Sequence, residues 1–235
     1  MKAHPSQLAR AMAWRSTKRV ARTTIDAVTD AQVLALCLAM TDRATPMPFG
    51  GRETVATHSL GLVLALIAAD EAIPPRLDRA TLYSFAAVHD AVEAVTGDVD
   101  TSLWSPELQQ AKDALEQAGR AALINMLPKQ LYRTWLDYER QDTAEARTVR
   151  LFDKVMPKVQ RWVVAGVDDA QLPDEDVARR ELDAQARRLE LDAPEEWRWF
   201  SPIFDRAGAL LLKEISAQAL RRAHEDGQAV DQVQP

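Results

Sequence analysis

The fold is decided around one stretch, His89-Asp90-Ala91-Val92-Glu93-Ala94-Val95-Thr96-Gly97-Asp98. It closes an otherwise apolar segment, residues 82–95, which is predicted to form a buried helix. On such a helix His89 and Glu93 lie four residues apart on one face, while Asp90 points about 100° away. A metal ion or a substrate at that edge could therefore meet all three side chains.

A His-Asp pair near a helix end is usually a hydrogen-bonded pair at the surface. Here apolar residues surround the pair, namely Leu82, Phe85, Ala86, Val88, Val92 and Val95. Burying a charge without a partner or a metal ion is costly. The sequence therefore predicts that partners for this pair come from elsewhere in the chain.

Composition limits the classes of protein to consider. The 235 residues are 47% hydrophobic and 27% charged, which is typical of a globular chain with one substantial core. The single Cys37 lies in an apolar run, which favours a packed thiol and a reducing compartment. No apolar run approaches the roughly 18 to 20 residues that span a bilayer, so we expect a cytoplasmic protein without membrane contact. The formal charge of −6 argues against a nucleic-acid-binding surface.

Charge and periodicity divide the chain into four expected parts. Residues 1–24 form a basic arm, which we interpret as solvated rather than as a transit peptide or a nucleic-acid contact. Residues 25–166 form the main domain, and residues 167–223 form an acidic helical extension packed on it. Residues 224–235, which begin with His224, are expected to be a disordered tail.

The apolar periodicity predicts an all-α fold, with helices over residues 26–40, 54–73, 82–95, 106–126, 129–139, 144–165 and 204–222. Residues 41–52 contain two prolines and a Gly-Gly pair, which predicts a loop with neither regular helix nor central strand. No alternating pattern indicates a strand elsewhere. An aromatic group should dock the last helix; it consists of Trp197, Trp199, Phe200 and Phe204.

Two further residues, His58 and Asp153, are candidate ligands only when they are considered together with His89 and Asp90. His58 lies in the first turn of the helix predicted from residue 54, where a lone histidine is more often a core or capping residue than a ligand. Asp153 lies among apolar residues of a later helix, so it is either a misplaced surface residue or a fourth ligand. With His89 and Asp90 they form the ordered set H…HD…D.

That ordered set resembles the HD-domain metal-dependent phosphohydrolases, which carry H…HD…D on an all-α helical bundle. Within them the chain is similar to the bacterial YfbR-like 5′-deoxynucleotidase subfamily. The similarity is carried by Arg43, by residues 52–60 (RETVATHSL) and by the HD…E…TGD string of residues 89–98. It covers roughly residues 25–165, and it implies a homodimer.

The resemblance implies a single divalent cation, held by His58, His89, Asp90 and Asp153. Two imidazoles and two carboxylates suit Mn²⁺, Co²⁺, Ni²⁺ or Zn²⁺, and the ligand set alone does not choose among them. The cation would polarise a phosphoryl oxygen and acidify the water that attacks phosphorus.

The remaining roles are also expectations. A nucleoside 5′-alkoxide is a poor leaving group, so a proton donor is needed, and Glu93 is the first candidate. Asp98 is the second, either sharing that proton transfer or accepting a hydrogen bond from the sugar 3′-hydroxyl. By the resemblance Arg43 holds the phosphate with its planar fork, whereas Arg52 is a weaker carry-over.

One departure from the subfamily concerns the sugar. The residue after the phosphate-binding arginine is typically Trp, but here it is Ala44. The resulting space predicts activity on both ribonucleotides and deoxyribonucleotides. Phe49 in the same loop is the residue that could replace the missing ring.

The predicted function is release of phosphate from nucleoside 5′-monophosphates, with deoxynucleotides as the first candidates. An HD-type hydrolase of nucleoside triphosphates or guanosine polyphosphates is an alternative, because all of these enzymes share the metal site. A non-catalytic nucleotide-binding module is a third possibility. The presence of Glu93 and Asp98 argues against it, because a protein that only binds nucleotide needs no proton donor.

Overall fold

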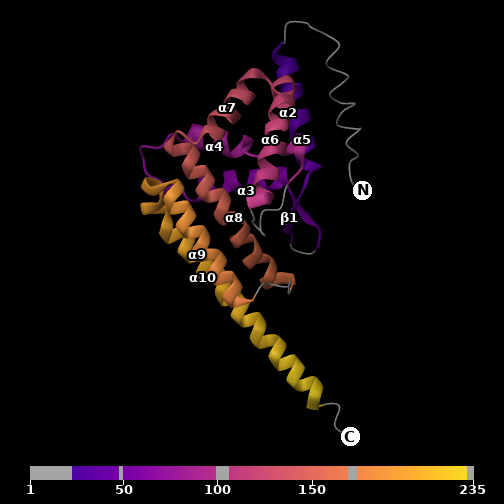
Figure 1. Ribbon diagram of the computed structural model, residues 1–235, viewed down its shortest axis with the longest axis vertical. Coiled ribbons are helices and arrows are strands. Elements are labelled where there is room, and N and C mark those ends of the chain that lie inside the picture. The colour runs from indigo at the N-terminus through magenta and orange to yellow at the C-terminus, as the bar shows by residue number, and fades with distance from the viewer. Residues whose placement is uncertain (1–22, 48–49, 99–105, 169–173, 232–235) are drawn as a thin grey trace. The chain divides into compact units, whose positions relative to one another are not determined.

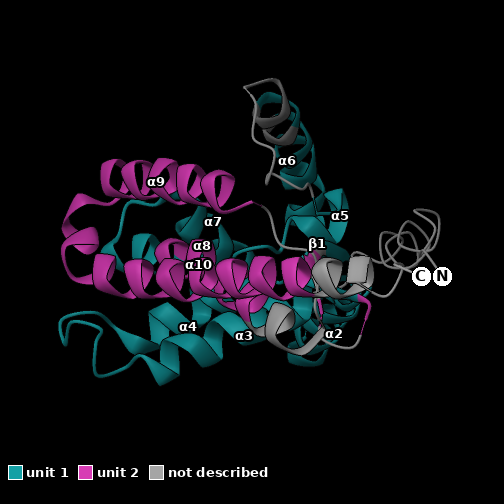
Figure 2. Cartoon of the chain, turned by 90° about the horizontal axis from the view of Figure 1, so that it is seen from below, with its two compact units in different colours: residues 1–44, 52–149 teal, residues 45–51, 150–235 magenta. Residues whose placement is uncertain are grey.

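The computed structural model describes residues 23–47, 50–98, 106–168 and 174–231 (Figure 1). The chain divides into two compact units (Figure 2). The first contains residues 1–44 and 52–149, and the second contains residues 45–51 and 150–235. The basic arm expected over residues 1–24 lies almost wholly outside the described residues.

The first unit is helical, as predicted. Its helices are α2 (Thr24–Ala39), α3 (Val55–Ala68), α4 (Arg79–Val88), α5 (Glu93–Thr96), α6 (Pro106–Met126), α7 (Lys129–Arg140) and the start of α8 (Ala144–Asp168). Each of α2 and α3 begins at a capping box, in which the threonine at the N-cap accepts a hydrogen bond from the backbone three residues later. The all-α prediction is confirmed.

The loop predicted over residues 41–52 contains a short hairpin instead. β1 (Asp42–Pro46) and β2 (Arg52–Thr54) form a two-stranded sheet. Gly50 and Gly51 adopt φ angles of 93° and 90°, a left-handed conformation that glycine tolerates best. Both strands are edge strands, where a proline is permitted. The prediction missed the hairpin because strands this short show no alternating pattern.

An apolar core holds the central stretch in place. Its buried members are Leu34, Cys37, Leu38, Val55, Val88, Ala91, Val92, Ala94, Leu123, Leu127 and Trp135. Residues 88, 91, 92 and 94 belong to this core, so the polar residues between them are fixed from the apolar side. Burial raises the pKa of the Cys37 thiol, in keeping with the predicted packed, unreactive cysteine.

The second unit contains the rest of α8 together with α9 (Glu175–Asp192) and α10 (Pro194–Asp231). Helices α9 and α10 lie side by side (Figure 1). A small core joins this unit, made by Ala178, Leu211 and Ile215 with Trp162 and Leu212. Among the described residues, no helix has both the length and the apolar content needed to cross a bilayer.

Helix α10 is longer than predicted at both ends. Its buried stripe starts well before residue 204 and recurs at three- and four-residue spacings through Trp197, Phe200, Phe204, Ala207, Leu211 and Ile215. The predicted aromatic group is thus the first part of the helix itself. The helix also continues past His224 to Asp231, where a disordered tail was expected.

Candidate metal centre

The central stretch is not one continuous helix. Helix α4 ends at Val88, and residues 89–92 form a tight turn before α5. In a continuous helix the Ala86 carbonyl would accept the N–H of residue 90, but here His89 Nδ1 lies 2.9 Å from that oxygen. The side chain takes the place of the helical bond, and Glu93 N donates to the Asp90 carbonyl at 3.0 Å instead. The prediction of a helix over residues 82–95 is corrected accordingly.

The turn and the start of α3 bring three potential ligands together. His58, His89 and Asp90 each offer one ligand atom, and these atoms all lie within 4.8 Å of one another. His89 Nε2 lies 3.0 Å from Asp90 Oδ2, and the two imidazole centroids are 5.4 Å apart. Both histidines are buried. Tyr138 of α7 contacts the His89 ring nearly at a right angle, with centroids 6.0 Å apart.

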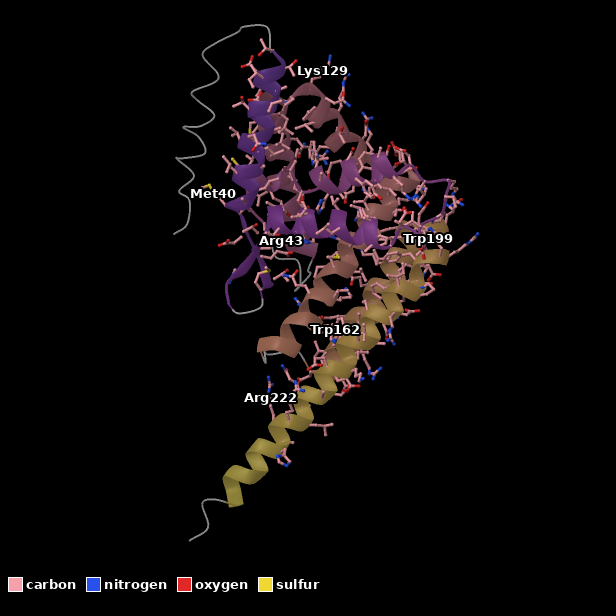
Figure 3. The ribbon with its side chains drawn as sticks, turned by 180° about the vertical axis from the view of Figure 1, so that it is seen from behind. Met40, Arg43, Lys129, Trp162, Trp199 and Arg222 are labelled. Atoms are coloured by element: carbon pink, nitrogen blue, oxygen red, sulfur yellow. The ribbon has the colours of Figure 1, made fainter. Side chains whose placement is uncertain are left out.

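Arg43 of β1, labelled in Figure 3, reaches three carboxylates beside these ligands. Its Nη1 donates to Asp90 Oδ2 at 2.8 Å and lies 3.7 Å from Glu93 Oε2. Its Nε lies 3.5 Å from Glu53 Oε2. The predicted phosphate-binding arginine and the predicted proton donor therefore lie in one cluster with Asp90.

Glu53 is the residue that sequence reasoning missed. It is buried in β2 between the exposed Arg52 and Thr54, which is half-buried, and its Oε1 lies 3.5 Å from His58 Nδ1. A carboxylate at the inward position of a strand, five residues before a candidate histidine ligand, is the signal that could have found it. Without the hairpin, that inward position is not visible.

The remaining predicted site residues belong to other segments of the chain. Asp98 follows Gly97, whose φ of 75° ends α5 as predicted, and the Asp98 side chain is half-buried. Ala44 lies in β1, but its side chain and all of Phe49 fall outside the described part of the chain. Asp153 lies in α8 of the second unit, buried, with Lys154 Nζ 2.7 Å from its Oδ2. Its assignment as a fourth ligand stays a prediction.

Comparison with known proteins agrees with this geometry. A family model described as "HD domain" matches residues 38–191. The chain belongs to the HD-domain family. Among curated proteins, the 5′-deoxynucleotidase HDDC2 of Bos taurus is 32% identical over 107 residues, which cover 43% of this chain and 49% of that protein. Its Homo sapiens counterpart is 30% identical over 107 residues, so the chain spans about half the length of these relatives.

Two solved structures share the fold of this HD-domain protein. The "Predicted metal-dependent phosphohydrolase" from Magnetospirillum magnetotacticum MS-1 superposes with a TM-score of 0.58 at 19% identity, covering 85% of this chain and 96% of that one. The PH0347 protein from Pyrococcus horikoshii OT3 gives a TM-score of 0.55 at 20% identity, covering 78% of this chain and 99% of that one. These likenesses concern the fold.

The HD cluster consists of His58, His89, Asp90, Arg43, Glu53 and Glu93. Its residues fit a divalent cation. Three carboxylates (Glu53, Asp90 and Glu93) lie around one guanidinium (Arg43), so acidic side chains outnumber basic ones in these contacts. A divalent cation held by the two histidines and Asp90 would offset this excess of acidic groups. The Ala86 carbonyl can only accept, so His89 Nδ1 carries the proton and Nε2 keeps its lone pair on the Asp90 side.

One titrating group lies near this cluster on α7. Glu139 Oε2 lies 2.9 Å from Arg120 Nη2. Burial is the main cause that raises the pKa of the Glu139 carboxyl, and the neighbouring Glu116 adds to it. The negative charge of Asp90 also raises this pKa, so the HD cluster influences the titration of a residue on α7.

Proposed function

We propose that this HD-domain protein is a metal-dependent phosphohydrolase that releases phosphate from nucleoside 5′-monophosphates. The observation that carries the proposal is the gathering of His58, His89 and Asp90 within 4.8 Å, next to Arg43 and Glu93. An arginine beside a metal site suits a phosphate ester, because its planar fork matches phosphate oxygens. The curated relatives are named 5′-deoxynucleotidases, which supports the substrate class.

His58, His89 and Asp90 would hold the cation, and Asp153 is proposed as a fourth ligand from the H…HD…D pattern. When bound, the cation supplies Lewis acidity and an acidified water. The ligand set admits Mn²⁺, Co²⁺, Ni²⁺ or Zn²⁺.

In the proposed reaction Arg43 binds the phosphate and Glu93 donates a proton. Arg43 would bind the phosphate and, through Asp90, stay anchored to the metal centre. Glu93 Oε2 lies 3.7 Å from Arg43 Nη1, so its carboxyl group stands beside the position of a phosphate held by that arginine. From there it can donate a proton to the departing 5′-oxygen. Asp98 remains the second candidate, for proton transfer or for the sugar 3′-hydroxyl.

A substrate panel tests the proposal. Purified protein is freed of metal and reloaded with Mn²⁺, Co²⁺, Ni²⁺ or Zn²⁺, and phosphate release is measured from 5′-dNMPs and NMPs. We expect phosphate from monophosphates with at least one of these ions. Pyrophosphate or triphosphate release from nucleoside triphosphates or guanosine polyphosphates, without turnover of monophosphates, would favour the other HD hydrolases. Tight nucleotide binding without any turnover would favour a binding module.

We also propose that the chain associates with a second copy of itself through α2 and α3. No exposed residue of either helix is charged, although 27% of the chain is charged. Large apolar side chains are about half or more exposed there: Ile25, Val28, Leu36, Met40, Leu60, Leu64 and Ile67. The two helices pack together, and Val55 N donates to the Thr41 carbonyl at 2.9 Å, which joins the end of α2 to the start of α3.

The apolar character of this face suits a dimer. Seven large apolar side chains, each about half or more exposed, lie on these two packed helices and at the C-cap of α2, and exposed apolar patches on a soluble protein mark interaction surfaces. A face whose exposed residues are uncharged also suits a symmetric contact, because the same surface then meets itself with few like charges in opposition.

Sedimentation velocity of Leu64→Glu tests the dimer. We expect a dimer for the wild type at tens of micromolar and a monomer for the variant, because a buried unpaired carboxylate opposes association. Leu220→Glu is the control, since Leu220 is 73% exposed on α10 and should change nothing. A monomeric wild type would contradict the proposal. Binding of wild type to anionic vesicles, lost in Leu64→Glu, would assign the face to a membrane instead.

A further inference from the structure

Glu53 is a buried acid of the HD cluster. It is neither one of the proposed metal ligands nor the proposed proton donor. Only 6% of its surface is exposed. Its two oxygens face different partners: Oε1 lies 3.5 Å from His58 Nδ1, and Oε2 lies 3.5 Å from Arg43 Nε. One carboxylate thus stands between a candidate metal ligand and the candidate phosphate-binding residue.

On the histidine side, Glu53 selects which ring nitrogen is available. At 3.5 Å, Glu53 Oε1 and His58 Nδ1 form no hydrogen bond, but the charge of the Glu53 carboxylate favours the tautomer with the proton on the nitrogen that faces it, His58 Nδ1. The lone pair then remains on Nε2. His89 reaches the same tautomer through the backbone carbonyl of Ala86. The two histidines therefore differ, because Nδ1 of His89 faces a backbone carbonyl whereas Nδ1 of His58 faces a side chain.

On the arginine side, Glu53 makes an ion-pair contact, not a hydrogen bond, with one edge of the guanidinium. Arg43 Nε faces Glu53 Oε2, which leaves Nη1 directed to Asp90 at 2.8 Å and to Glu93 at 3.7 Å. Because the guanidinium is planar, fixing Nε fixes the plane in which the remaining N–H groups point. The donors that would receive a phosphate are thereby oriented before it arrives.

We propose that Glu53 is a positioning residue that couples the orientation of His58, as metal ligand, to that of Arg43, as phosphate ligand. The inference rests on the proposed function. A carboxylate is required because both partners are donors. The amide of a glutamine has one accepting end only, so its NH₂ end would oppose either the Nδ1–H of His58 or the Nε–H of Arg43.

The variant Glu53→Gln follows from this argument, since it keeps shape and removes one acceptor. Calorimetric titration of the metal-free full chain with Mn²⁺ should show affinity weakened about 10- to 100-fold, the usual effect of losing a partner behind a metal ligand. Titration of the Mn²⁺-loaded protein with inorganic phosphate should show weaker binding as well. At saturating Mn²⁺ and nucleotide, kcat should fall only a few-fold while KM rises, because Glu53 touches no reacting atom.

Asp30→Asn is the matched control, because Asp30 is a buried acid of the same unit, 5% exposed, outside the cluster. It should leave both affinities unchanged. Glu53→Gln with wild-type Mn²⁺ and phosphate affinities would overturn the inference while leaving the proposed function intact. A wild type that binds no divalent ion would instead overturn the proposed function.

The tautomer of His58 can also be measured in the wild type, which does not require that the variant folds. Nitrogen-15 NMR of labelled histidine in the metal-free protein reports which ring nitrogen is protonated. We expect the proton of His58 on Nδ1. A proton on Nε2 of His58 would overturn the role of Glu53 directly.

Discussion

In the first unit a guanidinium, three carboxylates and two imidazoles share one buried cluster, whereas the helices of the second unit meet through rings and aliphatic side chains. Phe152 and Phe200 contact in the second unit with centroids 5.1 Å apart, and Trp197 and Phe204 with centroids 5.3 Å apart. In the cluster of the first unit the short contacts join charged atoms instead, such as Arg43 Nη1 and Asp90 Oδ2 at 2.8 Å.

This contrast indicates which substitutions each unit tolerates. Burial of apolar surface stabilises a fold directly, so the second unit gains its stability from the side chains that fill it. A buried ion cluster contributes little or nothing net, because the desolvation of each charge offsets the attraction between charges. The charges of the cluster therefore add little net stability to the first unit, and we expect substitutions in it to alter function more than stability.

The largest effect should come from removing a metal ligand. His89→Ala should lose bound metal, measured by elemental analysis, and phosphate release should fall to background. His224→Ala is the control, because His224 is an exposed imidazole of α10. Asp153→Ala is expected to behave like His89→Ala, and full metal occupancy in that variant would show that the fourth ligand is another residue.

Glu93→Gln should keep the metal but lose turnover. An amide cannot donate the proton that the leaving alkoxide requires, and general acid catalysis is typically worth about 10² to 10⁴ in rate. Initial rates and metal content of the same preparation separate the two effects. Activity within a few-fold of the wild type would move the proton donor to Asp98, for which Asp98→Asn is the companion variant.

In the second unit Phe200→Ala should act on stability. Phe200 is fully buried and contacts Phe152, Trp197 and Trp199. Truncation of a buried ring typically costs about 3–5 kcal/mol in the free energy of unfolding. Urea denaturation measures it, and Leu191→Ala is the control because Leu191 is 81% exposed on α9. A loss below about 1 kcal/mol, typical of surface sites, would place the strength of this unit elsewhere.

Lys158 is an exception within the second unit, since it brings a cation among apolar groups. Its Nζ lies 5.3 Å from the Phe204 ring centroid and donates to Gln185. Burial, followed by the charges of Arg161 and Lys154, lowers the pKa of the Lys158 ammonium to about 7. The unfolded chain holds this proton up to its ordinary pKa of 10.5, so folding is penalised below about pH 7 and relieved as pH rises from 7 to 10.5.

Lys158→Met should therefore stabilise the protein most at pH 6–7, by up to a few kcal/mol, and least near pH 10.5. Urea denaturation across this pH range checks both the sign and the trend. A variant that is equally stabilised at all pH values would mean that packing, rather than titration, explains the change. Lys154→Met serves as the control for removing a neighbouring positive charge.

Sequence periodicity predicted most helices, because a buried face leaves a mark every three or four residues. The stripe through Phe204, Leu211 and Ile215 is of this kind, although the helix that carries it extends beyond the predicted residues 204–222 at both ends. The H…HD part of the ordered set could also be found, since histidines and an acid in apolar surroundings are conspicuous. The structure brings these three residues together.

Features that depend on one local contact could not be predicted. The break after Val88 follows from the bond between the His89 ring and the Ala86 carbonyl, which no propensity encodes. The hairpin depends on two glycines with positive φ and is too short for a pattern. Glu53 became visible only once that hairpin turned it inward, because its partners His58 and Arg43 come from different elements.

The smallest effect concerns the sugar and rests on Ala44. If a bulky ring after the phosphate-binding arginine normally crowds the 2′-position, its absence leaves space for a 2′-hydroxyl. A steric pocket rejects an added hydroxyl by about 10²-fold at best, so kcat/KM for a 5′-dNMP and its matching NMP should differ by less than about tenfold. Ala44→Trp should restore a preference for the deoxynucleotide. A strong deoxy preference in the wild type would refute the open pocket, and its disappearance in Phe49→Ala would identify Phe49 as the ring that closes it.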